Sequence, residues 1–353
     1  MNKSLIAFAA LAVLAGTASA QSSVTIYGRM DLGMVVDSGN PAGKVVRLSS
    51  GVAKGSQLGF KGVDDLGGGY KASFQLETGY CADSAIAGGM TPGGPAGEAA
   101  GSTNFCSGSN QFMGRQSRGE ISGGFGALDG GRQFALGYLT MLKTDPFLGT
   151  AGQMNNIIDP SGFRLSNSVR YWTPVYAGFG ASVDMAFGEL AGNWQASREL
   201  GGSVDYDMGD AHAHLIYYKL NNANGVGSAK QNVMLAGTYD FGIVKLHGLA
   251  QKTTGEPTGK AKLDTFAYML GVSVPLAGGR VQASYVEGND KTSANKDANQ
   301  VAIGYLYQFS KAVSAYTAYG RIRNEHGAAF TDGNATDAGY GNRSFNLGMA
   351  YDF

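Results

Sequence analysis

Hydrophobic and polar residues alternate with a period of two along most of this chain. In the segment 70–77 the apolar set is Tyr70, Ala72, Phe74 and Leu76, and the polar set is Lys71, Ser73, Gln75 and Glu77. The segments 24–34 and 301–308 repeat the alternation, whereas apolar stripes at helical spacing are hard to find. This pattern predicts an all-β protein in which each strand has one apolar and one polar face.

Sixteen strands can be counted, separated in turn by short and long connections. They are expected to begin near residues 24, 56, 70, 111, 127, 164, 180, 199, 211, 229, 244, 263, 280, 298, 313 and 343. All eight prolines are placed in the loops or turns between these strands. That placement suits a closed sheet, because a proline within such a sheet would remove a ladder hydrogen bond.

A transmembrane barrel explains this map better than a soluble β-fold does. Sixteen long, evenly spaced strands are many for one sandwich, and no propeller repeat of about 40–45 residues is present. In a membrane the backbone must pair completely, and alternation places apolar side chains in lipid and polar ones in a wet lumen. We therefore predict a 16-stranded antiparallel transmembrane β-barrel with short periplasmic turns and long extracellular loops.

The first twenty residues have the form of a secretory signal peptide. Lys3 precedes an apolar run from Leu5 to Ala15, which is too short to span a bilayer, and the sequence Ala18-Ser19-Ala20 suits cleavage before Gln21. Residues 1–20 are thus predicted to be removed, and residues 21–353 to form the barrel. The mature chain has a net charge near −1, so no basic excess indicates a nucleic acid partner.

The two cysteines, Cys81 and Cys106, flank one stretch rich in glycine and proline. An exported chain enters an oxidising compartment, so we expect them to form a disulfide that closes a long loop. A Cys-x-x-Cys redox or zinc motif is absent from the sequence.

Six segments in this order resemble the general porins of Gram-negative bacteria, of the beta-proteobacterial type. They are QSSVTIYGRMDLG, SQLGFKGVDDLGGGYKASFQLETG, ISGGFGALDGGRQF, DPF, NSVRYWTPVYAGFGASV and FNLGMAYDF. The resemblance covers essentially the whole mature chain. It implies a homotrimer in the outer membrane, in contact with lipid and lipopolysaccharide, that lets ions and small hydrophilic solutes diffuse passively with a weak leaning to anions.

The resemblance also gives a role to the end of the chain. The last strand would close the barrel against the first, with Tyr351 facing lipid and Phe353 at the periplasmic aromatic girdle. An unpaired strand can be held by strand addition. The resemblance implies that Tyr351 and Phe353 form a signal read by the outer-membrane barrel assembly machinery.

The pore constriction is expected to lie between an inward-folded loop and a basic wall. Residues 139–162 form the longest loop that follows a strong strand, and by resemblance this third outer loop enters the lumen with Asp145 and Asp159. Strand parity places four basic side chains inward, and two more are less certain. The four are Arg29, Lys61, Arg164 and Arg170, and the two are Arg118 and Arg132. By parity Arg132 shares the side of Leu128, so it needs a β-bulge to turn inward. A charge that faces lipid costs about 2–4 kcal/mol, and this cost favours the inward position.

Other chemistry finds little support in the sequence. His212 and His214 share one strand face, as do Asp205 and Asp207, but no further metal ligand is near, so we expect ordinary lumen or rim residues and no metal or other cofactor. No Gly-x-Ser-x-Gly elbow is present, so an enzyme is not expected. The alternatives to a general diffusion porin are a substrate-specific channel, a barrel enzyme and an adhesin.

Overall fold

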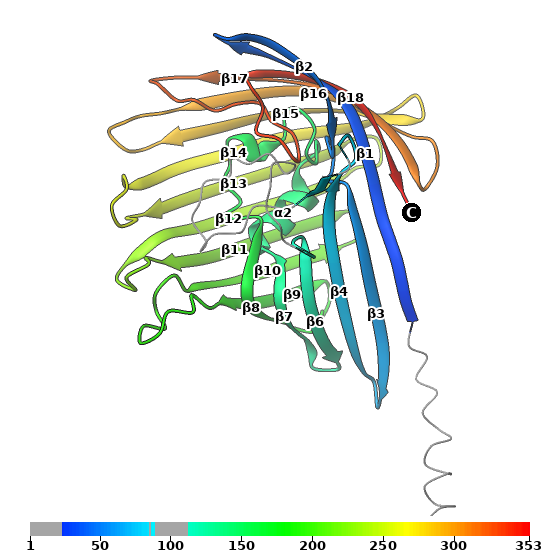
Figure 1. The fold of residues 1–353 in the computed structure, drawn as a ribbon, viewed down its shortest axis with the longest axis vertical. Helices are drawn as coiled ribbons and strands as arrows, with labels where there is room; N and C mark the ends of the chain where they lie inside the picture. The colour runs from blue at the N-terminus through cyan, green and yellow to red at the C-terminus, as the bar shows by residue number, and fades with distance from the viewer. Residues whose placement is uncertain (1–22, 85, 89–111) are drawn as a thin grey trace, which may run out of the picture.

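The computed structural model describes residues 23–84, 86–88 and 112–353, and nearly all of its regular structure is antiparallel sheet (Figure 1). The strands are β1 Ser23–Asn40, β2 Gly43–Ser50, β3 Gln57–Gly67, β4 Tyr70–Cys81, β5 Ile86–Gly88, β6 Gln116–Gly123, β7 Gly126–Phe134, β8 Arg164–Trp172, β9 Phe179–Ala186, β10 Glu199–Met208, β11 Ala211–Asn221, β12 Ser228–Asp240, β13 Lys245–Gly255, β14 Leu263–Leu276, β15 Gly279–Asp290, β16 Ala298–Gln308, β17 Val313–Asn324 and β18 Arg343–Asp352. One helix, α2 Leu136–Thr144, and one 3-10 turn, η1 Met154–Asn156, interrupt them.

The sheet closes into a ring because its first and last strands pair. β1 pairs with β18 from Arg29↔Asp352 to Ser38↔Arg343, and its lower part pairs with β3. Two strands lie outside the ring: β2 extends the upper part of β1 as a hairpin, and β5 pairs with the tip of β4. The remaining sixteen form the predicted antiparallel barrel.

The predicted strand starts agree closely with the structure. Fifteen lie within one residue of the observed start, and only β6 differs, because it begins at Gln116 and not near 111. The proline placement was wrong at one position: Pro275 is the penultimate residue of β14, where it pairs with Arg280 beside the turn. The expected signal peptide 1–20 and Cys106 lie outside the described residues. The Cys81–Cys106 disulfide therefore stays a prediction.

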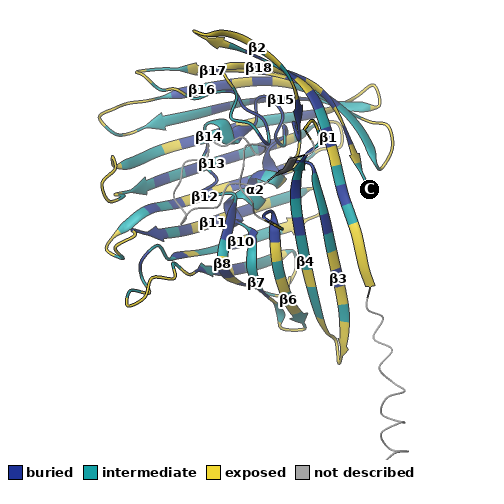
Figure 2. Ribbon diagram, in the orientation of Figure 1, coloured by how far each residue is buried: buried dark blue, intermediate teal, exposed yellow. Residues whose placement is uncertain are grey.

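Each strand presents its two faces as the alternation predicted. In β18, Ser344, Asn346 and Ala350 are buried, whereas Leu347 and Met349 are about half exposed on the outer face. The dark and light bands along the strands in Figure 2 show the same alternation round the barrel. Among the described residues, no helix is long and apolar enough to cross a membrane.

The short turns use backbone conformations that suit tight hairpins. Between β14 and β15, Ala277 and Gly278 both have positive φ, at 51° and 77°. Two consecutive residues of this kind match the twist of the flanking strands, as in a type I′ turn. The long connections lie at the other end of the barrel, and the largest described one, residues 135–163, runs between β7 and β8.

A hydrophobic core lies inside the barrel, between the 135–163 loop and one part of the wall. Inward residues of β11–β15 form the wall side of this core: Ile216, Met234, Leu249, Met269 and Val286. Leu136, Met141, Met154 and Ile158 of the loop pack against them. Figure 1 draws α2 within the ring of strands, so the expected inward folding of the third loop is confirmed.

At the barrel seam, the ring of Phe353 covers Gly28 of β1. The amide of Gly28 donates to the carbonyl of Phe353 at 2.9 Å, and the amide of Phe353 donates back at 3.0 Å. A Cβ added to Gly28 would lie 2.5 Å from the ring and 2.7 Å from the carbonyl oxygen of Gln57. The seam therefore requires glycine at this position.

We expect Gly28→Ala to lower the free energy of unfolding by about 1–3 kcal/mol, the usual cost of overpacking. Gly248→Ala is the matched control, because a Cβ at this glycine of β13 would meet nothing within 4 Å. Urea unfolding of both variants in detergent micelles measures the difference. Equal stability of the two variants would show that the ring and the Gln57 carbonyl can move away freely.

Candidate functional site: the lumen and its inward loop

Asp145 organises the inward loop from within. Its carboxylate accepts hydrogen bonds from the amides of Phe147, at 2.9 Å, and Met154, at 2.8 Å. Burial raises the pKa of Asp145 to about 6. The side chain is buried, so the prediction that Asp145 lines the pore constriction needs correction: its carboxylate closes the loop and does not face the water of the lumen.

A second loop, residues 325–342, holds the inward loop in place. The carboxylate of Asp332 accepts from the amide of Gly152 at 2.8 Å and from the Nδ2 of Asn156 at 2.9 Å. Gln153 donates to the carbonyl of Asn334 at 2.8 Å. Asp332 is fully buried, and burial raises its pKa to about 7.

Asp31 of β1 anchors a third segment, residues 51–56. Its carboxylate accepts from the amides of Val52, Ala53 and Lys54 at 3.1–3.2 Å and from the hydroxyl of Tyr316 at 2.6 Å. Asp31 is fully buried. Nothing in the sequence pattern indicates that Asp31 binds segment 51–56, because the residue and the segment meet only in the folded barrel.

Three of the predicted basic residues lie on the inner wall of β1, β3 and β6. Arg29 forms a two-point ion pair with Asp352. The ammonium of Lys61 is exposed and lies 5.3 Å from the centre of the Tyr27 ring. Arg118 lies 3.1 Å from Glu120 and 3.3 Å from Asp129, so carboxylates of the same wall compensate its charge.

The other three basic residues are held by the wall between β7 and β8. Arg170 is buried and pairs with Asp184 at 2.7 Å. Arg164 donates to the carbonyl of Arg115 and stacks on the Phe134 ring. The bulge required by Arg132 is present between Gly131 and Gln133, and Arg132 donates to the Gly114 carbonyl and the Ser166 hydroxyl.

The basic side chains on this side of the lumen, here called the basic cluster, are Arg29, Lys54 and Arg280, together with Lys61 of the neighbouring strand β3. Sequence reasoning found Arg29 and Lys61 and missed the other two. The pKa of Lys54 is lowered first by burial and then by the charge of Arg29, and Arg280 adds to the effect. Within the described part of the chain, Lys54, Lys61 and Arg280 form no ion pair. Their charges are therefore less compensated than those of Arg118 or Arg170. Arg280 could have been found from its place two residues after the β14–β15 turn on the polar face.

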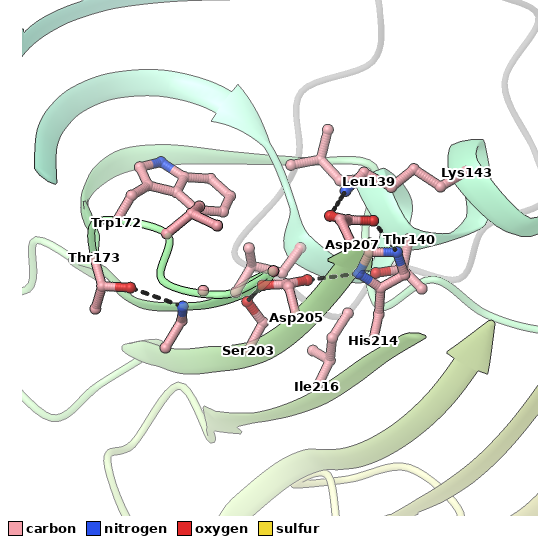
Figure 3. A pocket seen from close by; sticks show the side chains of 15 residues that line it. Leu139, Thr140, Lys143, Trp172, Thr173, Ser203, Asp205, Asp207, His214 and Ile216 are labelled. Carbon is pink, nitrogen blue, oxygen red and sulfur yellow. Dashed lines mark hydrogen bonds and ion pairs between the residues drawn. The ribbon is translucent and has the colours of Figure 1, made fainter. Parts of the chain in front are cut away.

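The inward loop carries Asp145 and Asp159 as expected, and a further group of acidic residues lies on the wall of β10 and β11. Asp159 of the loop forms an ion pair with Lys230 of β12. Across β10 and β11, Asp205 lies opposite His214 and Asp207 lies opposite His212, and these four residues are here called the acidic ladder. Figure 3 shows three of them beside α2. No group of three or more metal-binding side chains is found among the described residues.

A closed barrel with a charged lumen and an inward loop is a membrane channel, and relatives of the chain agree. A family model for Gram-negative porins matches residues 7–327. The chain is 33% identical over 343 residues to outer membrane porin protein 32 of Delftia acidovorans, covering 92% of this chain and 90% of the relative. It is 29% identical to the major outer membrane protein P.IB of Neisseria gonorrhoeae, covering 93% and 95%.

A solved structure, an anion-selective porin from Comamonas acidovorans, is similar with a TM-score of 0.75 and 28% identity, covering 94% of this chain and 100% of that one. The chain belongs to the Gram-negative porin family. It is accordingly a channel protein of the outer membrane and not an enzyme.

The buried carboxyl of Asp332 makes stability depend on pH. Its pKa is raised from 3.8 to about 7, so between these values the native protein holds a proton that the unfolded chain has released. The contribution of Asp332 is therefore most favourable at low pH and is lost as pH rises through 7. We expect Asp332→Asn to unfold at a higher temperature than the wild type at pH 8, with a smaller difference at pH 5 that vanishes only below the unfolded pKa of 3.8.

Thermal unfolding in detergent at the two pH values measures this difference. Asp65→Asn, which removes an exposed carboxylate near the end of β3, is the control for loss of charge. A difference between Asp332→Asn and wild type that is the same at pH 5 and pH 8 would contradict the assignment.

Proposed function

We propose that this porin is a general diffusion pore for ions and small hydrophilic solutes with a weak preference for anions. The observation that carries the preference is the basic cluster, in which Lys54, Lys61 and Arg280 lack ion-pair partners in the described residues. The sign of charge that lines the narrow part of a pore decides which ions it favours. The relative described as anion-selective supports the same direction.

The inward carboxylates do not cancel this cluster. Asp145 and Asp332 are buried and bind loop amides, and Asp31 is engaged by four hydrogen bonds. Asp159 is paired with Lys230. These carboxylates therefore leave the positive charges of Lys54, Lys61 and Arg280 uncompensated, although Asp65 of β3 and Asp290 of β15 also form no ion pair among the described residues.

We infer further that the pore is a homotrimer in contact with outer-membrane lipid and lipopolysaccharide. Support comes from the exposed apolar outer face, which includes Ile26, Leu48, Leu270 and Ile303 at 57–63% exposure. The assembly machinery would recognise the last strand through Tyr351 and Phe353, whose rings stack at 6.1 Å and are half exposed. Strand addition explains how an edge strand of this kind can be held before the barrel closes.

Single-channel recording across a tenfold KCl gradient tests the pore and its sign. We expect conductance in steps of three and a reversal potential that favours chloride. The triple variant Lys54→Gln, Lys61→Gln, Arg280→Gln should lose most of that potential, whereas Lys260→Gln in an exposed loop is the control. The preference should also weaken between 0.1 M and 1 M salt, because the Debye length falls from about 10 Å to about 3 Å.

The outcomes separate the parts of this proposal. A folded barrel that conducts no ions would overturn the diffusion pore. A conducting barrel with a reversal potential that favours potassium would overturn the anion preference alone. Steps that occur singly in every recording would contradict the trimer.

A further inference from the structure

A cavity of about 250 Å³ lies between helix α2 and the inner wall of β8–β11 (Figure 3). Its apolar side consists of Leu136, Leu139, Trp172, Val175 and Ile216. Its polar side is formed by Asp205, Asp207 and His214 of the acidic ladder, with Ser203, Thr140 and Lys143 nearby. The cavity is open at the short-turn end of the barrel, where Val175 is 71% exposed.

The acidic ladder fixes the polar side of this cavity. The Nδ1 of His214 lies 2.6 Å from the carboxylate of Asp205, and the Nδ1 of His212 lies 2.7 Å from that of Asp207. These pairs stand directly opposite each other on neighbouring strands, so the backbone register holds them. A carboxylate accepts only, so in each pair the histidine Nδ1–H is the donor.

One buried nitrogen of this ladder has no partner. His214 is 1% exposed, and its Nε2 makes no hydrogen bond. With the proton on Nδ1, a neutral His214 presents Nε2 as an acceptor. The Oδ1 of Asp207, a second acceptor, lies 3.8 Å from Nε2. A single nitrogen that carries several N–H groups could stand about 2.9 Å from both atoms.

Among the described residues, Lys143 of α2 is the only lysine or arginine in the lining, and its contact with Asp207 is weak. Its Nζ is 3.4 Å from Asp207, and the two side chains are 54% and 42% exposed. An ion pair this exposed contributes about 0–1 kcal/mol, so an incoming cation can displace it. The lining contains the two carboxylates of Asp205 and Asp207 against the one ammonium of Lys143, so the cavity is acidic.

We propose that this cavity binds small organic cations: primary amines that carry an aromatic or branched apolar body. The ammonium group donates to Asp207 Oδ1 and His214 Nε2 and competes with Lys143, which lies on Oδ2 of the same carboxylate. The apolar body lies against Trp172, Leu139 and Val175 and covers their exposed aromatic and aliphatic surface. The site is separate from the basic cluster, and binding there is a property in addition to passive diffusion. Loss of the site would therefore leave salt conductance unchanged.

Two probes of matched shape test the charge requirement. 2-Phenylethylamine and 3-phenylpropionate share a ring and a two-carbon linker but carry opposite charges. The purified channel with Trp194→Phe leaves Trp172 as its sole tryptophan, since Trp194 is the only other one and lies in the exposed loop 187–198. We expect a saturable change in Trp172 fluorescence with the amine and none with the acid at equal concentration.

Variants then locate the site. Asp207→Asn should weaken binding of the amine at least tenfold, and Lys143→Met should tighten it, because the competing ammonium is gone. Asp210→Asn, in the exposed turn at the same end but outside the lining, is the matched control and should bind like the parent. Salt conductance equal to that of the parent verifies that each variant forms an open, folded barrel.

Three results would overturn the proposal. They are an equal response to both probes, unchanged affinity in Asp207→Asn, or weaker binding of the amine in Lys143→Met. A linear, unsaturable fluorescence change that is the same in every variant would count as non-specific quenching and would equally contradict a site. None of these results bears on the diffusion pore, which the conductance of the parent channel tests independently.

Discussion

The ladder between β1 and β18 is the interaction on which the rest of the structure depends. Lipid offers no hydrogen-bond partners, so a sheet in a membrane must have no free edge. Ten residue pairs, from Arg29↔Asp352 to Ser38↔Arg343, remove that edge. The register of the ladder also decides which side chains face inward, because a slip of one residue would exchange the two faces. Asp31 and Arg29 reach the lumen only in this register, and the ring of Phe353 covers Gly28 only there.

The arrangement of the loops inside the lumen also depends on β1. Asp31 binds segment 51–56, and the carbonyls of Ser50 and Val52 accept hydrogen bonds from Thr336 and Ala335 of the last loop. That loop holds the inward loop through Asp332. Three connections far apart in the sequence therefore support one another, and the apolar row on β11–β15 gives the inward loop a surface to pack against. The inward loop is thus positioned by a core within the barrel, on one side, and by buried carboxylates on the other.

Period-two alternation was enough to predict the strand number, fifteen of the sixteen starts and the inward face of Arg29, Lys61 and Arg170, because successive side chains in a strand point to opposite faces and the apolar set marks the outer one. It could not predict partners across the ring. Asp352 is 323 residues from Arg29, and Asp145 binds amides of its own loop, which no spacing rule reveals. One signal was available and was not used: Ile216, Met234 and Met269 interrupt the polar face of their strands, and they mark where the inward loop packs.

Positive and negative side chains of the lumen lie on different walls of the barrel. This separation affects solutes more than the net charge of the chain does. The chain is close to neutral overall, yet the basic cluster lies on β1, β3, β15 and segment 51–56, while the acidic ladder lies on β10 and β11, half-way round the ring from β1. The packed inward loop lies along the wall near the acidic ladder. Net charge therefore indicates little about which solutes the lumen favours, because a solute responds to the field along its own path. Anions and amines would accordingly meet their preferred surfaces on different walls of the same pore.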